Sequence, residues 1–257
     1  MDLKDVSAIV TGGASGLGAA TARRLAARGA NVVIADISEN KGKETAAGIG
    51  GVFARVDVTS TEDIVAATEL ATTLGPLRVL VNCAGTGFAG RTVGRGGYET
   101  AHDLDMFRRI IEINTVGTFD CIRIAATAMA RTEPLADGER GAIVNTASLA
   151  AFDGQVGQAA YAASKGGIVG MTLPIARDLA AIGVRVCTIA PGLIDTPIYG
   201  EGPAAEQRKE KLKRDVLFPR RLGTADEFAT LALELLGNSY LNGEVIRIDG
   251  GARLQPK

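Results

Sequence analysis

The sequence has 257 residues, with 28 lysines and arginines against 29 aspartates and glutamates, which gives a formal net charge of −1. This balance argues against a generally basic nucleic-acid-binding protein, and the lack of tryptophan with only 4% aromatic residues argues against a stacking surface for single-stranded nucleic acid. Hydrophobic residues make up 46% of the chain, enough to bury a substantial core. The 33 glycines exceed the usual share and predict many tight backbone turns.

Three cysteines (Cys83, Cys121 and Cys187) lie far apart and form no CxxC motif, which is typical of a reducing compartment and indicates no disulfide framework. The single histidine, His102, argues against a His-ligated metal site and a His-based catalytic triad, so we expect no metal. The first ten residues lack the layout of a signal peptide, and no apolar run approaches the roughly 18 residues of a membrane span. We therefore expect a cytoplasmic protein that contacts no membrane.

Short apolar, β-branched segments alternate with longer amphipathic ones along the chain. The short segments predict strands at Val6–Thr11, Asn31–Asp36, Val52–Val58, Leu77–Cys83, Ala142–Ala147, Val184–Ala190 and Glu244–Asp249. The longer segments predict helices at Gly16–Arg28, Ser60–Leu74, Met106–Ala130, Tyr161–Ala181 and Ala225–Leu236. Continuous apolar sequences such as VVIAD and VLVNC are typical of strands covered on both faces. The pattern predicts an α/β fold: a single-domain, Rossmann-type doubly wound sheet of seven parallel strands, with helices on both faces, over residues 1–257.

Two connections are longer than this alternation requires. One is a glycine- and charge-rich insertion at residues 86–103, and the other spans about residues 195–219 directly after a predicted strand. In a parallel α/β sheet such loops lie at the carboxyl ends of the strands, where ligands bind. We interpret residues 195–219 as a substrate lid; a surface loop with solvated charges is the alternative.

The first predicted connection is a glycine-rich loop, TGGASGLG at residues 11–18, between a strand and a helix. Gly12, Gly16 and Gly18 would let the backbone approach a pyrophosphate, whose charge meets the helix N-terminus; a structural turn is the alternative. Asp36 ends the second predicted strand, where a carboxylate accepts hydrogen bonds from ribose hydroxyls and repels a 2′-phosphate. Because Ile37 supplies no positive charge for that phosphate, the sequence favours NAD over NADP as the cofactor.

Three residues form a candidate catalytic set. Tyr161 and Lys165 are four residues apart, so they share one face of the predicted helix. A nearby ammonium, helped by the positive nicotinamide, favours the phenolate form of a tyrosine. An ordinary tyrosine has a pKa near about 10, and a decrease of about 3 units requires roughly 4 kcal/mol of differential interaction. Ser148 ends a predicted strand and could hold a substrate oxygen while Tyr161 takes the proton. A hydrolase is disfavoured because no histidine is available to activate Ser148 and no GxSxG motif surrounds it.

These motifs resemble the short-chain dehydrogenase/reductase family over nearly the whole chain. TGGASGLG at 11–18, NCAG at 82–85, Asn114, Ser148, Tyr161, Lys165 and PG at 191–192 follow the order and spacing of that family. The resemblance implies a catalytic set in which Asn114 holds a water that links Lys165 to solvent. It also implies an adenosine and ribose site formed by Ser15, Leu17, Asp36, Asp57, Val58, Cys83, Ala84 and Gly85. At the nicotinamide end it implies contacts from Pro191, Gly192, Ile194 and Thr196, in addition to Tyr161 and Lys165.

Within that family, the segment around Tyr161 and the ending LNGEVIRIDGGARLQP are similar to the type II 3-hydroxyacyl-CoA dehydrogenases. This similarity implies NAD-dependent interconversion of (S)-3-hydroxyacyl-CoA and 3-ketoacyl-CoA, with Gln158 near the substrate beside Ser148 and Tyr161. Basic residues in the lid, with Arg91 and Arg95 of the insertion, could attract the CoA phosphates, although a solvated helix face explains them equally well. A hydroxysteroid or other secondary alcohol is the alternative substrate, and a dinucleotide-binding scaffold subunit is the non-enzymatic alternative. The resemblance also implies a homotetramer, for which the apolar faces of residues 106–130 and 161–181 are candidate interfaces.

Overall fold

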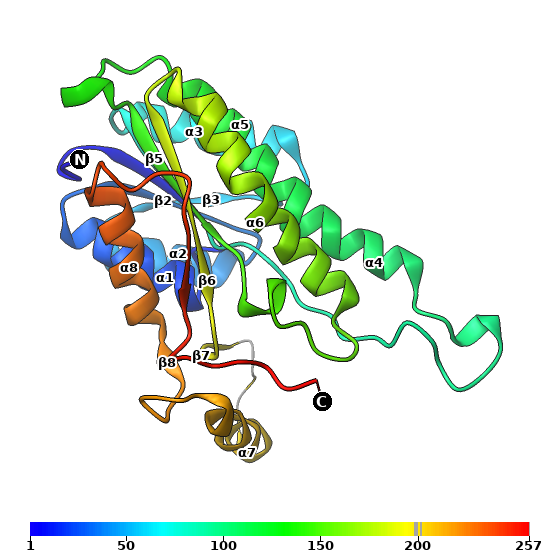
Figure 1. Ribbon diagram of the computed structural model, residues 1–257. Helices are drawn as coiled ribbons and strands as arrows, with labels where there is room; N and C mark the ends of the chain where they lie inside the picture. Colours follow the sequence, from blue (N-terminus) through cyan, green and yellow to red (C-terminus); the bar gives the residue numbers. More distant parts are fainter. Residues whose placement is uncertain (198–199, 201, 257) are drawn as a thin grey trace.

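The computed structural model describes residues 1–197, 200 and 202–256. Its main sheet is parallel and has the strand order β3-β2-β1-β4-β5-β6-β9 (Figure 1). The strands of this sheet are β1 (Ser7–Thr11), β2 (Asn31–Asp36), β3 (Val52–Arg55), β4 (Leu77–Asn82), β5 (Gly141–Thr146), β6 (Val184–Pro191) and β9 (Val245–Ile248). The chain builds outward from β1 to β3, returns to the centre and continues outward from β4 to β9. The predicted doubly wound sheet is therefore confirmed, and its topological switch point lies between β1 and β4.

Helices cover both faces of this sheet (Figure 1). The two hydrophobic clusters between helices and sheet divide each strand by alternation: Ala8 and Val10 of β1 pack in one cluster, and Ile9 packs in the other. This double burial explains why the strand sequences are apolar without interruption. One layer contains α1 (Gly16–Ala27), α2 (Glu39–Ile49) and α8 (Ala225–Gly237); the other contains α3 (Thr61–Thr73), α5 (Gly117–Met129) and α6 (Ala159–Ala180), with α4 (Leu104–Ile111) packed on α6.

Two helices differ from the sequence-based expectation. The predicted continuous helix at 106–130 is divided into α4 and α5 by a π-helical turn at Glu112–Val116. Helix α2 was not expected, because its sequence has glycines where an amphipathic helix usually has apolar residues. Gly42 of α2 is buried, and a Cβ there would lie 2.2 Å from the ring of Phe53 in β3. The glycine lets the helix pack closely on the strand and removes the apolar periodicity at the same position.

The two long connections lie where the strands end. The insertion at 86–103 contains a 3-10 turn at Tyr98–Thr100, and the second connection contains β7 (Ile194–Asp195) and α7 (Pro203–Leu212), with residues 198, 199 and 201 outside the described part. Strand β7 pairs with β8 (Gly223–Thr224) in a separate small sheet. Among the helices of the described residues, none has the length and apolar character that a membrane span requires.

Candidate active site

The fold brings the three candidate catalytic residues together at the carboxyl ends of the central strands. Ser148 follows β5, and Tyr161 and Lys165 lie one turn apart in α6. The side chain of Ser148 interacts with the hydroxyl of Tyr161 and lowers the pKa of Tyr161, and Nζ of Lys165 lies 6.0 Å from the centroid of the Tyr161 ring. A serine hydroxyl, a phenol and an ammonium therefore converge on one site, in which a substrate oxygen could receive two hydrogen bonds.

Lys165 is buried, with 5% of the residue exposed, and its ammonium donates a hydrogen bond of 2.8 Å to the carbonyl of Thr146 at the end of β5. Burial lowers the pKa of Lys165 to about 8 because the charged form loses its hydration. The neighbouring Cys83 is partly buried, and desolvation raises the pKa of its thiol to about 11. Cys83 is therefore a neutral thiol near pH 7 and supplies no counter-charge for Lys165.

The expected decrease in the pKa of Tyr161 is not observed in the protein alone. Burial raises the pKa of Tyr161 above its ordinary value, and the hydrogen bond with Ser148 offsets part of this effect. The expectation included the positive nicotinamide beside Tyr161, so a lowered pKa of Tyr161 in the cofactor complex stays a prediction. Desolvation of the phenolate is the largest cause of the raised pKa of Tyr161 in the protein alone.

Asn114 lies in the π-helical turn between α4 and α5 and is fully buried. Its side-chain oxygen accepts a hydrogen bond of 2.8 Å from the amide of Thr86, and its side-chain nitrogen donates to the carbonyl of Thr86 at 2.8 Å and to Oγ of Ser164 at 2.9 Å. The Asn114 carbonyl accepts a hydrogen bond from Thr118. Both amide protons of the side chain are therefore used by protein atoms, whereas the side-chain oxygen and the backbone carbonyl each accept one of these bonds.

The glycine-rich loop lies at the switch point, and its glycines let backbone segments approach one another closely; we call residues 11–18 the glycine cradle. Gly12 has φ +64°, and a Cβ there would lie 2.6 Å from the amide nitrogen of Ala84. A Cβ at Gly18 would lie 2.2 Å from the carbonyl oxygen of Gly12. Both positions therefore require glycine. The loop leads directly into the N-terminus of α1, where Ser15 is the N-cap residue and Leu17 lies in the first turn. These residues fit the pyrophosphate of a dinucleotide, because glycines leave the backbone amides of the loop uncovered by side chains beside a helix N-terminus.

Asp36 extends this cradle from the end of β2. One carboxylate oxygen accepts a hydrogen bond of 3.0 Å from the amide of Ala14, and the other accepts one of 2.9 Å from the amide of Ser38. The carboxylate is therefore held in a fixed position beside the glycine-rich loop. Ile37 next to it is 63% exposed, so the place that a 2′-phosphate would need is bordered by an acidic and an apolar side chain.

The remaining residues expected at the adenosine side lie at neighbouring strand ends. Asp57 follows β3, and hydrogen bonds from the backbone and side chain of Thr59 lower the pKa of its carboxyl group. Val58 is buried and packs against Gly117, where a Cβ would lie 2.8 Å from the Val58 carbonyl. Cys83, Ala84 and Gly85 follow β4; a Cβ at Gly85 would lie 3.4 Å from Nζ of Lys165. This segment therefore passes between the glycine-rich loop and the catalytic lysine.

A polar row beneath the cradle was not identified from the sequence as a unit. Thr11, Asn82 and Asn145 occupy the same register on β1, β4 and β5 and are buried. Asn82 donates a hydrogen bond of 2.9 Å to the side-chain oxygen of Asn145, and Oγ1 of Thr11 accepts one of 3.2 Å from the amide of Ala84. The row fixes the segment after β4 against β1. The detectable signal was a polar residue at the same place near the end of three apolar strands.

The residues expected at the nicotinamide end lie where β6 leads into the second long connection. Pro191 ends β6, and a Cβ at Gly192 would lie 2.6 Å from Cβ of Asp249. Ile194 is buried in β7, and Cβ of Thr196 lies 3.6 Å from where a Cβ of Gly16 would be. The start of the predicted lid therefore lies beside the glycine-rich loop.

Gln158, expected near the substrate, is the N-cap residue of α6, three residues before Tyr161. Its side-chain oxygen accepts a hydrogen bond of 3.0 Å from the amide of Gln155 in the same loop. The oxygen is therefore used within the loop, and the amide nitrogen is the part of this side chain that could contact a substrate.

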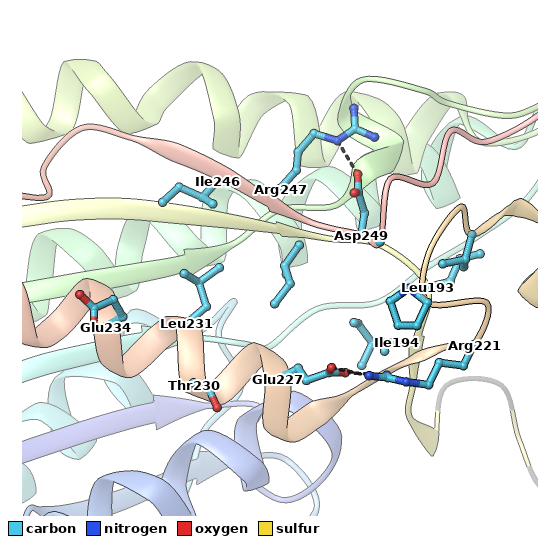
Figure 2. Close-up of a pocket in the computed structure, with 15 residues that line it drawn as sticks. Leu193, Ile194, Arg221, Glu227, Thr230, Leu231, Glu234, Ile246, Arg247 and Asp249 are labelled. Carbon is cyan, nitrogen blue, oxygen red and sulfur yellow. Dashed lines mark hydrogen bonds and ion pairs between the residues drawn. The ribbon is translucent and has the colours of Figure 1, made fainter.

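A cavity of about 690 Å³ lies between α8 and β9, and Ile194 is the expected site residue that lines it (Figure 2). Leu231 and Ile246 face it from the two elements, and the Arg221–Glu227 ion pair borders it. Its lining contains none of Ser148, Tyr161 and Lys165. We place the active site at the strand ends, because the glycine cradle and the converging titratable groups are there. Within the described part of the chain, no group of three or more His, Cys, Asp or Glu residues could hold a metal ion.

Comparison with known proteins agrees with this geometry. The profile of the family described as short chain dehydrogenase matches residues 7–207. The chain is 53% identical to the 3-hydroxyacyl-CoA dehydrogenase type-2 of Drosophila melanogaster, covering 99% of this chain and 100% of the relative. It is 51% identical to the protein of the same name from Homo sapiens, covering 99% and 97%. A crystal structure of 3-hydroxyacyl-CoA dehydrogenase type-2 from Mycobacterium avium superposes with a TM-score of 0.94 at 47% identity and covers 98% of both chains.

The chain therefore belongs to the short-chain dehydrogenase family. It is an oxidoreductase, and membership of this family implies a nicotinamide dinucleotide as its cofactor. The type-2 3-hydroxyacyl-CoA dehydrogenases named above are the relatives that it resembles over its whole length.

Proposed function

We propose that the chain is an NAD-dependent dehydrogenase that interconverts (S)-3-hydroxyacyl-CoA and 3-ketoacyl-CoA. The observation that carries the proposal is the convergence of Ser148, Tyr161 and Lys165 at the carboxyl ends of the strands of a doubly wound sheet. Identity of about half over the full length to relatives named 3-hydroxyacyl-CoA dehydrogenase type-2 supports the substrate class.

Each catalytic residue has a separate task in this proposal. The bound dinucleotide supplies a hydride acceptor in oxidation and a hydride donor in reduction. Ser148 donates a hydrogen bond to the substrate oxygen, and Tyr161 accepts the hydroxyl proton as the carbon–hydrogen bond breaks. In reduction Tyr161 returns that proton to the carbonyl oxygen. The buried ammonium of Lys165 stabilises the Tyr161 phenolate, and protons leave toward solvent past the backbone carbonyl of Asn114.

The glycine-rich loop and the adjacent strand ends support NAD in particular. Gly12, Gly16 and Gly18 would hold the pyrophosphate, with the Ser15 and Leu17 amides at the helix N-terminus. Asp36 is fixed by two backbone amides and would accept hydrogen bonds from the adenosine ribose while repelling a 2′-phosphate. The segments after β3, β4 and β6 would complete the site with Asp57, Val58, Cys83, Ala84, Gly85, Pro191, Gly192, Ile194 and Thr196.

Only some basic residues of the second long connection are available to bind the phosphates of a CoA thioester. Lys209 forms ion pairs with Asp195 and Glu206, Lys213 with Glu210, and Arg221 with Glu227. Four others have no ion pair among the described residues and are the ones that could contact CoA phosphates: Arg208, Lys211, Arg214 and Arg220.

We also propose that copies of the chain associate, as a homotetramer, through the layer that contains α5 and α6. Val116, Phe119 and Leu173 on this layer are 44%, 46% and 46% exposed, so the layer presents large apolar side chains to solvent. Burial of such a face between copies would remove apolar surface from water. Sedimentation measurements at micromolar concentration would test the association.

The proposed reaction is tested by NADH oxidation with acetoacetyl-CoA, free acetoacetate and a ketosteroid, with Tyr161→Phe as the control. Turnover of acetoacetyl-CoA that greatly exceeds turnover of acetoacetate, and is lost in the variant, would support the proposal. Turnover of the ketosteroid alone would keep the catalytic roles and overturn the substrate. Tight NADH binding without turnover of any compound would overturn the reaction and favour a dinucleotide-binding scaffold.

A further inference from the structure

The loop that connects Ser148 to Tyr161 begins as a compact hydrogen-bonded turn. Oγ of Ser148 accepts a hydrogen bond of 3.1 Å from the amide of Ala150, and the amide of Asp153 donates one of 2.9 Å to the carbonyl of Leu149. The backbone from Ser148 to Asp153 is thus linked as one unit. A displacement of Asp153 would therefore displace Ser148.

Arg247 of β9 holds the far end of this turn. Its guanidinium donates hydrogen bonds of 2.7 Å to the carboxylates of Asp153 and Asp249 and one of 3.1 Å to the carbonyl of Ala252. It also lies 5.2 Å from the ring centroid of Phe152. The side chain of Arg247 is 22% exposed and that of Asp153 is 19% exposed, so solvent screens this ion pair only partly. Figure 2 shows Arg247 bonded to Asp249 at the end of β9.

The second half of the loop is bonded to the C-terminal segment. The amide of Val156 donates a hydrogen bond of 3.1 Å to the carbonyl of Pro256, and the side chain of Gln155 donates one of 2.8 Å to the carbonyl of Gln255. Gln155 also donates its amide to Gln158, the N-cap residue of α6. In Figure 1 the C-terminal segment, in red, turns away from β9 at the carboxyl ends of the strands. Both halves of the loop are therefore attached to the last part of the chain.

We propose that Arg247, with the backbone carbonyls of Gln255 and Pro256, is a positioning device that sets the distance between Ser148 and Tyr161. Arg247 contacts neither of these catalytic residues and acts through Asp153. The device holds the first half of the loop by an ion pair and the second half by backbone hydrogen bonds, so Ser148 and the start of α6 are fixed by the same segment.

The chain offers a matched control in Arg253. This residue also bonds to Asp249, at 3.3 Å, but its side chain is 60% exposed and its other hydrogen bond is to the carbonyl of Ala252. Arg247→Met and Arg253→Met each remove one arginine that bonds to the carboxylate of Asp249. Only the first removes the bond to Asp153.

The test measures the pKa of Tyr161 with NAD bound, from the increase in ultraviolet phenolate absorbance that Tyr161→Phe abolishes. Because a hydrogen bond from Ser148 lowers this pKa, a displaced Ser148 raises it. We expect Arg247→Met to raise the pKa of Tyr161 and Arg253→Met to leave it unchanged. Equal values in both variants and the wild type would overturn the proposal. Loss of thermal stability alone would not change this titration.

A kinetic readout complements the titration and rests on the proposed function. With acetoacetyl-CoA we expect kcat to fall about tenfold or more in Arg247→Met, with the dissociation constant of NADH unchanged, because a misplaced catalytic group slows chemistry. If Arg247→Met does not fold, Asp153→Asn removes the carboxylate charge while the Arg247–Asp249 pair stays, and the same outcomes apply. The titration needs no substrate, so failure of acetoacetyl-CoA as a substrate would overturn the proposed function and leave the titration to decide this inference.

Discussion

Nζ of Lys165 lies 6.0 Å from the ring centroid of Tyr161, and desolvation opposes the charged form of each side chain. Burial raises the pKa of Tyr161 and lowers that of Lys165 to about 8, so both groups move toward neutrality in the protein alone. The ion pair that the mechanism requires is therefore incomplete without a further positive charge. An oxidised nicotinamide ring next to Tyr161 would supply that charge.

Replacement of Tyr161 by phenylalanine removes the proton acceptor and keeps the ring. We expect turnover to fall by at least about a hundredfold, the usual contribution of a positioned general acid or base. The dissociation constant of NADH should stay within a few-fold of the wild-type value, because the glycine cradle and Asp36 are unchanged. Steady-state rates and fluorescence titration with NADH measure the two quantities. A parallel loss of both would show that Tyr161 mainly holds the cofactor.

Lys165 makes stability depend on pH in a predictable direction. The pKa of Lys165 is lowered from 10.5 to about 8 in the folded protein. Between these values the unfolded chain binds more protons than the folded one, so the contribution of Lys165 to the free energy of unfolding rises as pH increases through this window. From about pH 7.5 to about pH 10 the gain is roughly 2 kcal/mol.

This gain is isolated by comparison with Lys165→Met, in which the titrating group is absent. Urea unfolding of both proteins at the two pH values gives the difference in the free energy of unfolding, and effects of all other groups cancel to first order. We expect the wild type to become more stable relative to the variant at the higher pH. A constant difference would mean that the ammonium of Lys165 is not desolvated.

The sheet and the proximity of the candidate catalytic residues could be predicted from the sequence because burial and local spacing determine them. Strands covered on both faces need uninterrupted apolar residues, and all seven expected strands of the main sheet are present. Tyr161 and Lys165 share a helix face by their separation alone. The glycine-rich loop was recognisable because glycine is required at Gly12 and Gly18, where a Cβ would clash with backbone atoms.

Other features depend on contacts between distant segments and could not be predicted. The π-helical turn at Asn114 forms where its amide is bonded to Thr86, 28 residues earlier. Helix α2 was missed because Gly42 replaces an apolar residue at a close helix–strand contact. The direction of the Tyr161 pKa shift depends on its burial, which the spacing of Tyr161 and Lys165 does not reveal.

Cofactor preference should depend on Asp36 and Ile37. Asp36→Asn removes the negative charge and keeps an oxygen that can accept from the amide of Ala14. We expect this variant to bind NADPH about tenfold more tightly than the wild type does, because a like-charge repulsion is removed. Adding Ile37→Arg should strengthen NADPH binding further, and Ile37 is 63% exposed, so the change disturbs no core contact. Fluorescence titration with both cofactors measures the ratio; equal NADPH affinity in all three proteins would remove Asp36 from cofactor selection.

Substitution of glycine by alanine should have opposite effects on stability at Gly12 in the glycine-rich loop and at Gly48 in α2. At Gly12 the backbone has φ +64° and a Cβ would lie 2.6 Å from the Ala84 amide nitrogen, so Gly12→Ala must displace the segment after β4. We expect a loss of stability greater than about 1 kcal/mol and loss of NADH binding. Gly48 lies near the end of α2 with no atom within 4 Å of its Cβ position, so Gly48→Ala should stabilise the helix by about 0.5–1 kcal/mol. Urea unfolding and NADH titration of both variants measure the contrast. Retained NADH affinity in a folded Gly12→Ala protein would show that the cofactor does not require this close approach.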